Sequence, residues 1–155
     1  MVNKVKLIDG YRVVQLSFDF LEDLWDKANG NQEAIFGTTQ YSEYMDMMFK
    51  SLTVASEDNK IVLIARPLRP PYALVHGIFF DRRVFSEETK NEIKWVIKWL
   101  KSRYDLRCVE CRISKKAKAL SRLLNDLGYV KIQGTEGEWG GNILETYRHM
   151  EVNHG

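Results

Sequence analysis

The chain has 155 residues, of which 45% are hydrophobic and 28% are charged, and its formal net charge is +2. This composition excludes a disordered chain, and the length predicts a single domain over residues 1–155. The sequence has no apolar run of membrane-spanning length, and its polar start does not resemble a secretory signal. We therefore expect a cytoplasmic protein with no membrane partner, in which both cysteines stay reduced.

The first half of the chain predicts two hairpins separated by two helices. Asp9-Gly10 lies between two short apolar runs, as in a tight hairpin turn. Apolar residues at helical spacing predict one helix after Ser17 and another from about Thr39 to Leu52. The second hairpin pairs the runs Thr53–Ser56 and Lys60–Ala65.

The second half predicts a strand, a helix, a parallel strand, a second helix and a final antiparallel pair. In such a βαβ unit, ligands usually bind beyond the carboxyl end of the first strand, facing the helix N-terminus. The fold class is thus α/β (α+β), with a mixed central sheet of six to seven strands and about four helices. The predicted elements are the strand Tyr72–Phe80, the helix Glu87–Arg103, the strand Leu106–Ile113, the helix Lys115–Leu127 and the strands Tyr129–Gln133 and Asn142–Met150.

In this order of elements the chain resembles the GNAT superfamily of N-acetyltransferases. The most specific match is the strand Val109–Ile113 followed by Ala117–Tyr129, which ends in Leu-Gly-Tyr. The resemblance implies that acetyl-CoA lies between the strands Tyr72–Phe80 and Leu106–Ile113. It also implies that a substrate amine attacks the thioester directly.

The resemblance further implies where the cofactor would be held. Backbone groups near Ile78, Phe79 and Phe80 would pair with the pantetheine arm of acetyl-CoA. The pyrophosphate would lie on the turn before the central helix, where backbone N–H groups and the helix dipole favour an anion. The residues of that turn are Arg82, Arg83, Val84, Phe85 and Ser86.

The chain departs from the family pattern at three points. The turn contains no glycine, so side chains occupy space that the family leaves open for phosphates. Ser86 can cap the central helix by itself, and Glu87 and Glu88 place negative charge where a phosphate would bind. Leu124 and Ala117 stand where the family commonly has a proton-donating tyrosine and an asparagine.

Three other residues are candidates for acid–base catalysis. Glu110 could act as a base through water, or could simply pair with Arg107 or Arg112. His76 lies in the middle of a predicted strand, where a histidine with a structural hydrogen bond is the alternative to a catalytic one. Tyr104 is a candidate proton donor.

Two further features have ordinary explanations. Cys108 and Cys111 form one Cys-x-x-Cys without the second pair or histidines of a zinc site, so we predict no metal. The segment 90–118 is rich in Lys and Arg, which is typical of a solvated helix face; the alternatives are attraction for CoA phosphates and, with no accompanying motif, nucleic acid.

Two functions stay open on this basis. The first is an acyl-CoA-dependent N-acetyltransferase with a degenerate phosphate turn, whose partners are acyl-CoA and an amine. The second is a non-catalytic GNAT-like protein that binds a protein partner. Phage-encoded GNAT-like proteins, some of them virion components, show a similar loss of glycines in the turn, and the chain resembles them in this respect.

Overall fold

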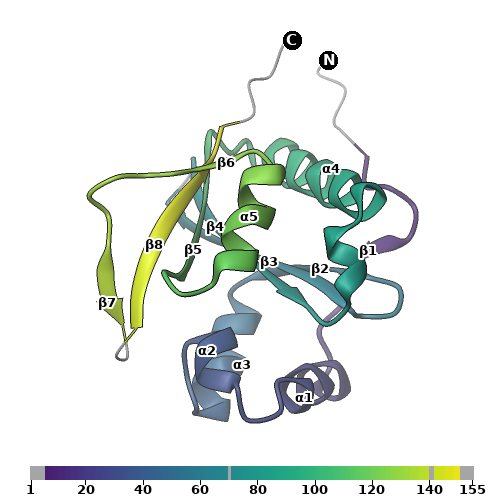
Figure 1. The fold of residues 1–155 in the computed structure, drawn as a ribbon. Helices are drawn as coiled ribbons and strands as arrows, with labels where there is room; N and C mark the ends of the chain where they lie inside the picture. The colour runs from purple at the N-terminus through teal and green to yellow at the C-terminus, as the bar shows by residue number, and fades with distance from the viewer. Residues whose placement is uncertain (1–5, 70, 140–141, 151–155) are drawn as a thin grey trace.

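The computed structural model describes residues 6–69, 71–139 and 142–150, which form one mixed sheet with helices on both faces (Figure 1). The strands are β1 (Tyr11–Val13), β2 (Leu52–Ser56), β3 (Ile61–Arg69), β4 (Tyr72–Phe79), β5 (Cys108–Ser114), β6 (Tyr129–Lys131), β7 (Gly137–Trp139) and β8 (Asn142–His149). The helices are α1 (Phe18–Lys27), α2 (Gln32–Phe36), α3 (Tyr41–Phe49), the 3₁₀ turn η1 (Arg82–Phe85), α4 (Glu87–Tyr104) and α5 (Lys118–Asp126).

The sheet has the strand order β1-β2-β3-β4-β5-β8-β6, with β7 beside β8. All pairs are antiparallel except β4 and β5, which are parallel and joined by α4. The predicted α/β (α+β) class with a mixed sheet is confirmed. The described residues form eight strands rather than six to seven, because the glycine-rich segment before β8 contains the three-residue strand β7.

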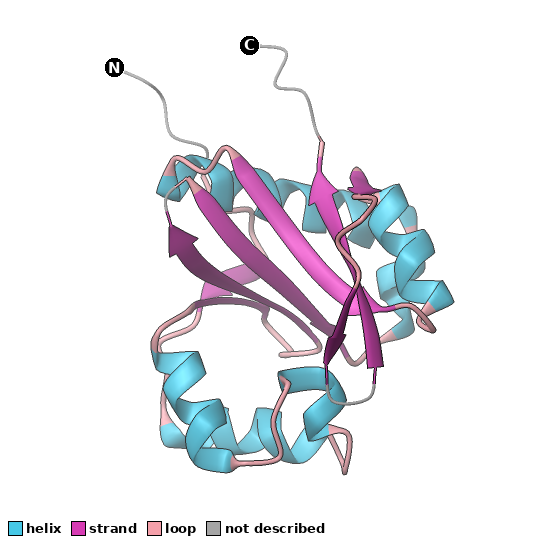
Figure 2. Ribbon diagram, turned by 90° about the vertical axis from the view of Figure 1, so that its left-hand side faces the viewer, coloured by secondary structure: helices cyan, strands magenta, loops and turns pink. Residues whose placement is uncertain are grey.

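The two faces of the sheet have separate apolar cores. Helices α4 and α5 cover one face, while α1, α2 and α3 cover part of the other (Figure 2). Because side chains alternate along a strand, β3 supplies Leu63 to the first core and Ile64 to the second. The site must therefore lie within or beside a sheet that is packed on both sides.

The central helix α4 begins as predicted. The Ser86 hydroxyl accepts a hydrogen bond of 3.2 Å from the Thr89 N–H, and Glu87 and Glu88 lie in the first turn. Ile93, Val96, Ile97 and Leu100 recur at helical spacing and are all buried in the first core. The last helix begins later than predicted, at Lys118, because β5 continues through Ser114.

The N-terminal strand does not form the predicted hairpin across Asp9-Gly10. Within the described residues, the segment before this turn is not a strand, and β1 pairs instead with β2, with Arg12 opposite Ala55. None of the helices in the described ranges has the length and apolarity that crossing a membrane requires.

Candidate active site between β4 and β5

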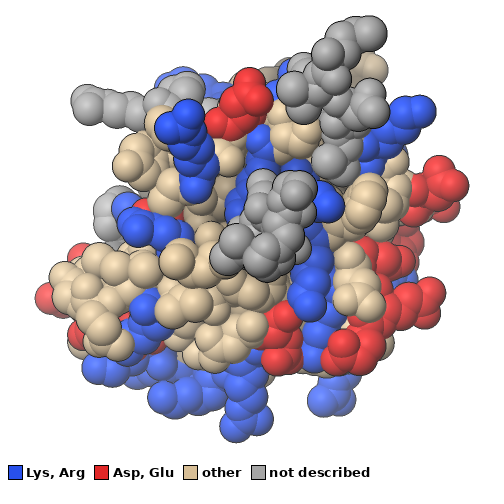
Figure 3. All heavy atoms as spheres, turned by 90° about the horizontal axis from the view of Figure 1, so that it is seen from above, with Lys and Arg blue, Asp and Glu red and all other residues tan. Residues whose placement is uncertain are grey.

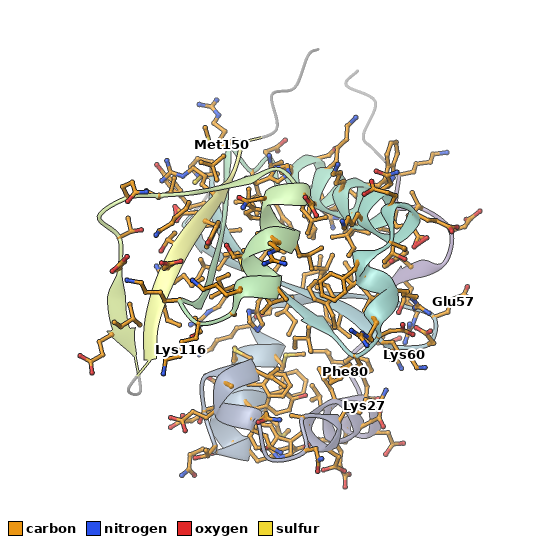
Figure 4. All side chains as sticks on the ribbon, in the orientation of Figure 1. Lys27, Glu57, Lys60, Phe80, Lys116 and Met150 are labelled. Atoms are coloured by element: carbon orange, nitrogen blue, oxygen red, sulfur yellow. The ribbon has the colours of Figure 1, made fainter. Side chains whose placement is uncertain are left out.

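Strands β4 and β5 part soon after they begin. Only three pairs join them, the last being Leu74 with Glu110. Beyond that pair, β4 stays bonded to β3 through Phe79, and β5 stays bonded to β8 through Ser114. Figure 4 shows Phe80, just after β4, and Lys116, just after β5, well apart. We call this divergence the β4–β5 opening.

Backbone polar groups of β4 face this opening. The Phe80 N–H donates a 2.7 Å hydrogen bond to the Lys60 carbonyl and thus points toward β3. Because successive residues of a strand direct their backbone groups to opposite edges, those of Gly77 and Phe79 point toward β5. Of the three residues expected to pair with pantetheine, the structure therefore directs the backbone of Phe79 into the opening and those of Ile78 and Phe80 away from it.

A small apolar cavity of about 50 Å³ adjoins the opening on the side of α4 and α5. Val75, Gly77 and Phe79 line it from β4, and Cys111 and Ile113 from β5. Leu124 on α5, at the position of the family's tyrosine, also lines it. The cavity thus offers an apolar surface and no hydroxyl at that position.

The ring of Phe79 folds back over Gly77. A methyl group on Gly77 would lie 2.5 Å from Cζ of Phe79, so only glycine leaves room for the ring in this position. Phe79 is partly buried against the first core, and its ring closes one wall of the cavity. Phe80 turns to the other face, where Lys27 lies 5.8 Å from its ring centroid (Figure 4).

The turn that leads from β4 into α4 is stabilised by its own side chains. Asp81 Oδ1 accepts a 2.9 Å hydrogen bond from the Arg83 N–H, and the Ser86 N–H donates to the Arg83 carbonyl. Val84 is 2% exposed and packs in the first core. This packing explains how the turn forms without glycine: Val84 anchors it from inside.

Arg83 points away from the β4–β5 opening. Its guanidinium makes a bidentate pair with Asp58, at 2.7 and 2.8 Å, in the turn between β2 and β3. The hydrogen bonds from Arg83 lower the pKa of Asp58 well below its usual range. Arg82, Arg83 and Phe85 are all exposed. Because the Arg83 guanidinium is held by Asp58, Arg82 is the arginine of this turn whose charge is available to a ligand.

Glu110 lies at the point where the two strands part. Val109 and Cys111 belong to the first core, so Glu110 faces the opposite side of the sheet from the cavity. Arg148 on β8 donates a 3.2 Å hydrogen bond to Glu110 Oε1, and the Cys108 thiol lies 3.6 Å from the same oxygen. Its partner is thus Arg148, a residue 38 positions away, rather than Arg107 or Arg112.

Among the described residues, neither His76 nor Tyr104 makes a hydrogen bond with Glu110. His76 Nε2 lies 2.7 Å from the Ile35 carbonyl oxygen, which is only an acceptor, so Nε2 carries the proton and donates. Burial lowers the pKa of His76, so it ties β4 to α2 as a neutral ring. Tyr104 ends α4, about 25 Å along the helix from the turn at its start.

The two cysteines are free thiols on opposite faces of β5. Burial raises the pKa of the Cys111 thiol to about 12, which makes it inert at neutral pH. Among the residues that the structure describes, no group of His, Cys, Asp and Glu is arranged to hold a metal ion. Figure 3 shows the molecule from above, with Lys and Arg spread over the view and Asp and Glu most frequent on its right-hand side.

Comparison with known proteins identifies the fold to which this arrangement of strands belongs. No protein-family model matches the sequence, and no curated protein matches it either. The structure, however, matches the spermidine N-acetyltransferase of Vibrio cholerae in complex with CoA and spermine, with a TM-score of 0.68 over 91% of this chain and 95% of that one, at 9% identity. The chain has the fold of the GNAT acetyltransferases.

A second GNAT structure supports the same conclusion. The GNAT-family acetyltransferase of Bacillus anthracis matches with a TM-score of 0.64 at 8% identity, covering 93% of this chain and 95% of that one. The similarity spans nearly the whole of both chains, so the GNAT fold accounts for both halves of the sheet. At such low identity the similarity concerns the fold, and the side chains of this chain have to be interpreted individually.

Proposed function

We propose that this GNAT-like protein is an N-acetyltransferase that transfers an acetyl group from acetyl-CoA to a primary amine. The observation that carries the proposal is the β4–β5 opening. An extended ligand with amide groups, such as pantetheine, can pair with the backbone of Gly77 and Phe79 there, as a strand would. A packed sheet without such a ligand gains nothing from parting two parallel strands, because their backbone groups lose their partners.

The two sides of the opening suit the two reactants, the acyl group and the amine. The cavity on the side of α4 and α5 is apolar and suits the acyl group. Glu110 lies on the other side, where an amine can approach the thioester carbonyl from the face opposite the acyl group. The reacting carbonyl would then lie near the last bonded pair, Leu74 with Glu110.

In this scheme Glu110 acts through water as the general base. An ammonium acceptor first gives up one proton to the solvent. The resulting neutral amine attacks the thioester carbonyl, and Glu110 takes up, through water, the proton that the nitrogen loses as the amide forms. The carbon–sulfur bond then breaks and CoA leaves as a thiolate. A thiol of ordinary pKa, near 8.5, leaves readily as a thiolate and is protonated by solvent, which is consistent with leucine at position 124.

The acceptor is proposed to be cationic before it reacts. Helices α1, α2 and α3, which cover part of the sheet face that bears Glu110, carry seven acidic residues and one lysine. Such a surface attracts ammonium groups and raises their local concentration. Because a structural neighbour is a spermidine N-acetyltransferase solved with spermine, polyamines are the first acceptors to test.

The first experiment is thermal unfolding with acetyl-CoA, with CoA and with neither. A ligand at about 100 times its dissociation constant adds about 2.7 kcal/mol of stability. For a chain of this length the midpoint would rise by about 5–10 °C. Acetyl transfer to spermidine, spermine and simple primary amines is then followed by release of the CoA thiol. Absence of any shift at several millimolar acetyl-CoA would contradict the proposal and leave the non-catalytic protein-binding function.

A further inference from the structure

The apolar cavity beside the β4–β5 opening is small, and its volume limits the size of the group that can bind in it. Its volume of about 50 Å³ is several times the 10–15 Å³ that a single water needs on the same measure. It therefore has room for a group of only a few heavy atoms. His76 also lines it, but the Nε2 of its imidazole is held by the Ile35 carbonyl on the opposite face.

A bulky side chain of β4 forms part of the cavity wall. Phe79 is the aromatic residue of β4 that lines the cavity, and its ring lies across Gly77 instead of extending away from the strand. Gly77 is what permits this position, since any side chain there would collide with the ring. Beneath the ring, the cavity ends against α4 and α5 at Ile97, Leu123 and Leu127.

We propose that Phe79 determines which acyl group the protein accepts, by closing the cavity to chains longer than a few carbon atoms. The inference rests on the proposed function and adds its acyl specificity. The thioester is proposed to lie near the pair Leu74 and Glu110, and the next residues of the two strands, Val75 and Cys111, line the cavity, so an acyl chain continues from the thioester into it. Amide-rich pantetheine would leave polar groups unpaired there, whereas an acyl chain has none.

The test measures binding and does not depend on catalysis. Dissociation constants of CoA, acetyl-CoA, butyryl-CoA and hexanoyl-CoA are determined by calorimetry for the wild type, Phe79→Leu and Phe79→Ala. The wild type should bind acetyl-CoA more tightly than butyryl-CoA and hexanoyl-CoA. Phe79→Ala should reverse that order, with a gain of up to about fourfold for each added methylene group that becomes buried. Phe79→Leu should fall between the two.

Phe20→Ala is the matched control, because it removes another partly buried phenylalanine from the second core, on the far side of the sheet. It should keep the wild-type order of acyl groups even if it lowers the unfolding temperature by a similar amount. If wild type and Phe79→Ala bind acyl-CoAs with the same order of chain length, the inference about Phe79 is wrong while the proposed function stands. If no variant binds any acyl-CoA, both are wrong.

Discussion

Arg83 and Asp58 form a bidentate ion pair, at 2.7 and 2.8 Å, that joins the turn before α4 to the turn between β2 and β3. Asp58 is further held by the Ser56 hydroxyl at 2.7 Å. The guanidinium that the sequence offers to a pyrophosphate is therefore already occupied by a carboxylate of the same chain. In the proposed function, the phosphates of CoA therefore have to bind another cation or displace this one.

The ion pair predicts an unequal contribution of the two neighbouring arginines to cofactor binding. Arg82→Ala should weaken acetyl-CoA binding by roughly three- to tenfold, because its exposed side chain is free to approach a phosphate and such exposed ion pairs contribute up to about 1 kcal/mol or slightly more. Arg83→Ala should change affinity less and should instead lower the unfolding temperature. Calorimetry and thermal unfolding measure the two effects, and a larger loss of affinity for Arg83→Ala would contradict the prediction.

The contact between Phe79 and Gly77 predicts a strong coupling between two substitutions. Gly77→Ala should destabilise the protein by about 1–3 kcal/mol, because the new methyl group displaces the ring. In a Phe79→Ala background the same change should cost much less. Urea unfolding of the two single variants and the double variant measures this coupling. Gly137→Ala is the control, since a methyl group there meets no atom within 4 Å; equal costs in both backgrounds would exclude the contact.

Glu110→Gln should affect acetyl transfer without affecting the binding of acetyl-CoA. Glutamine keeps the shape of Glu110 and can still contact Arg148, but it cannot accept a proton, so acetyl transfer should fall by about 100-fold or more. The dissociation constant of acetyl-CoA should stay within about twofold, because Glu110 faces away from the cavity. Thiol release and calorimetry test this prediction, and unchanged turnover would remove Glu110 from the mechanism.

The buried His76 should make the free energy of unfolding depend on pH. Burial lowers its pKa below the ordinary 6.5, so the unfolded chain binds a proton at this residue before the folded one does. The contribution of His76 to stability is complete above pH 6.5 and declines as the pH falls from there toward the lower pKa of the folded state. His76→Gln keeps a donor for Ile35 but does not titrate, so urea midpoints measured between pH 5 and 8 should show a shallower decline. The same slope in both proteins would refute this assignment.

The sequence predicted the elements better than it predicted the site. The period of Ile93, Val96, Ile97 and Leu100, together with the cap at Ser86, is local information, and α4 begins where these residues place it. Three decisive contacts of the site are not local. Arg83 with Asp58 spans 25 positions, Arg148 with Glu110 spans 38, and His76 with Ile35 spans 41, and nothing in the spacing of these residues pairs them.

One signal for the site was nevertheless present in the sequence. Gly77 is the single glycine of β4, and an isolated glycine in a strand often marks a close approach of other atoms. Its partner, Phe79, is only two residues away and on the same face of the strand. The hairpin predicted at Asp9-Gly10 is not seen among the described residues: the turn is present, but β1 pairs with β2, a strand about 40 residues further along the chain.

Because only three residue pairs join β4 to β5, the sheet consists of two ladders linked by a short seam. One ladder runs from β1 to β4 and the other comprises β5, β8, β6 and β7, and each keeps its own hydrogen bonds if the seam loosens. The two ladders can therefore separate at this seam with the loss of only a few hydrogen bonds, while α4 still connects β4 to β5. Amide protons of Ala73 and Glu110, which face the seam, should exchange with solvent faster than those of the paired residues at the centres of β3 and β8, and a ligand laid along the seam should slow them.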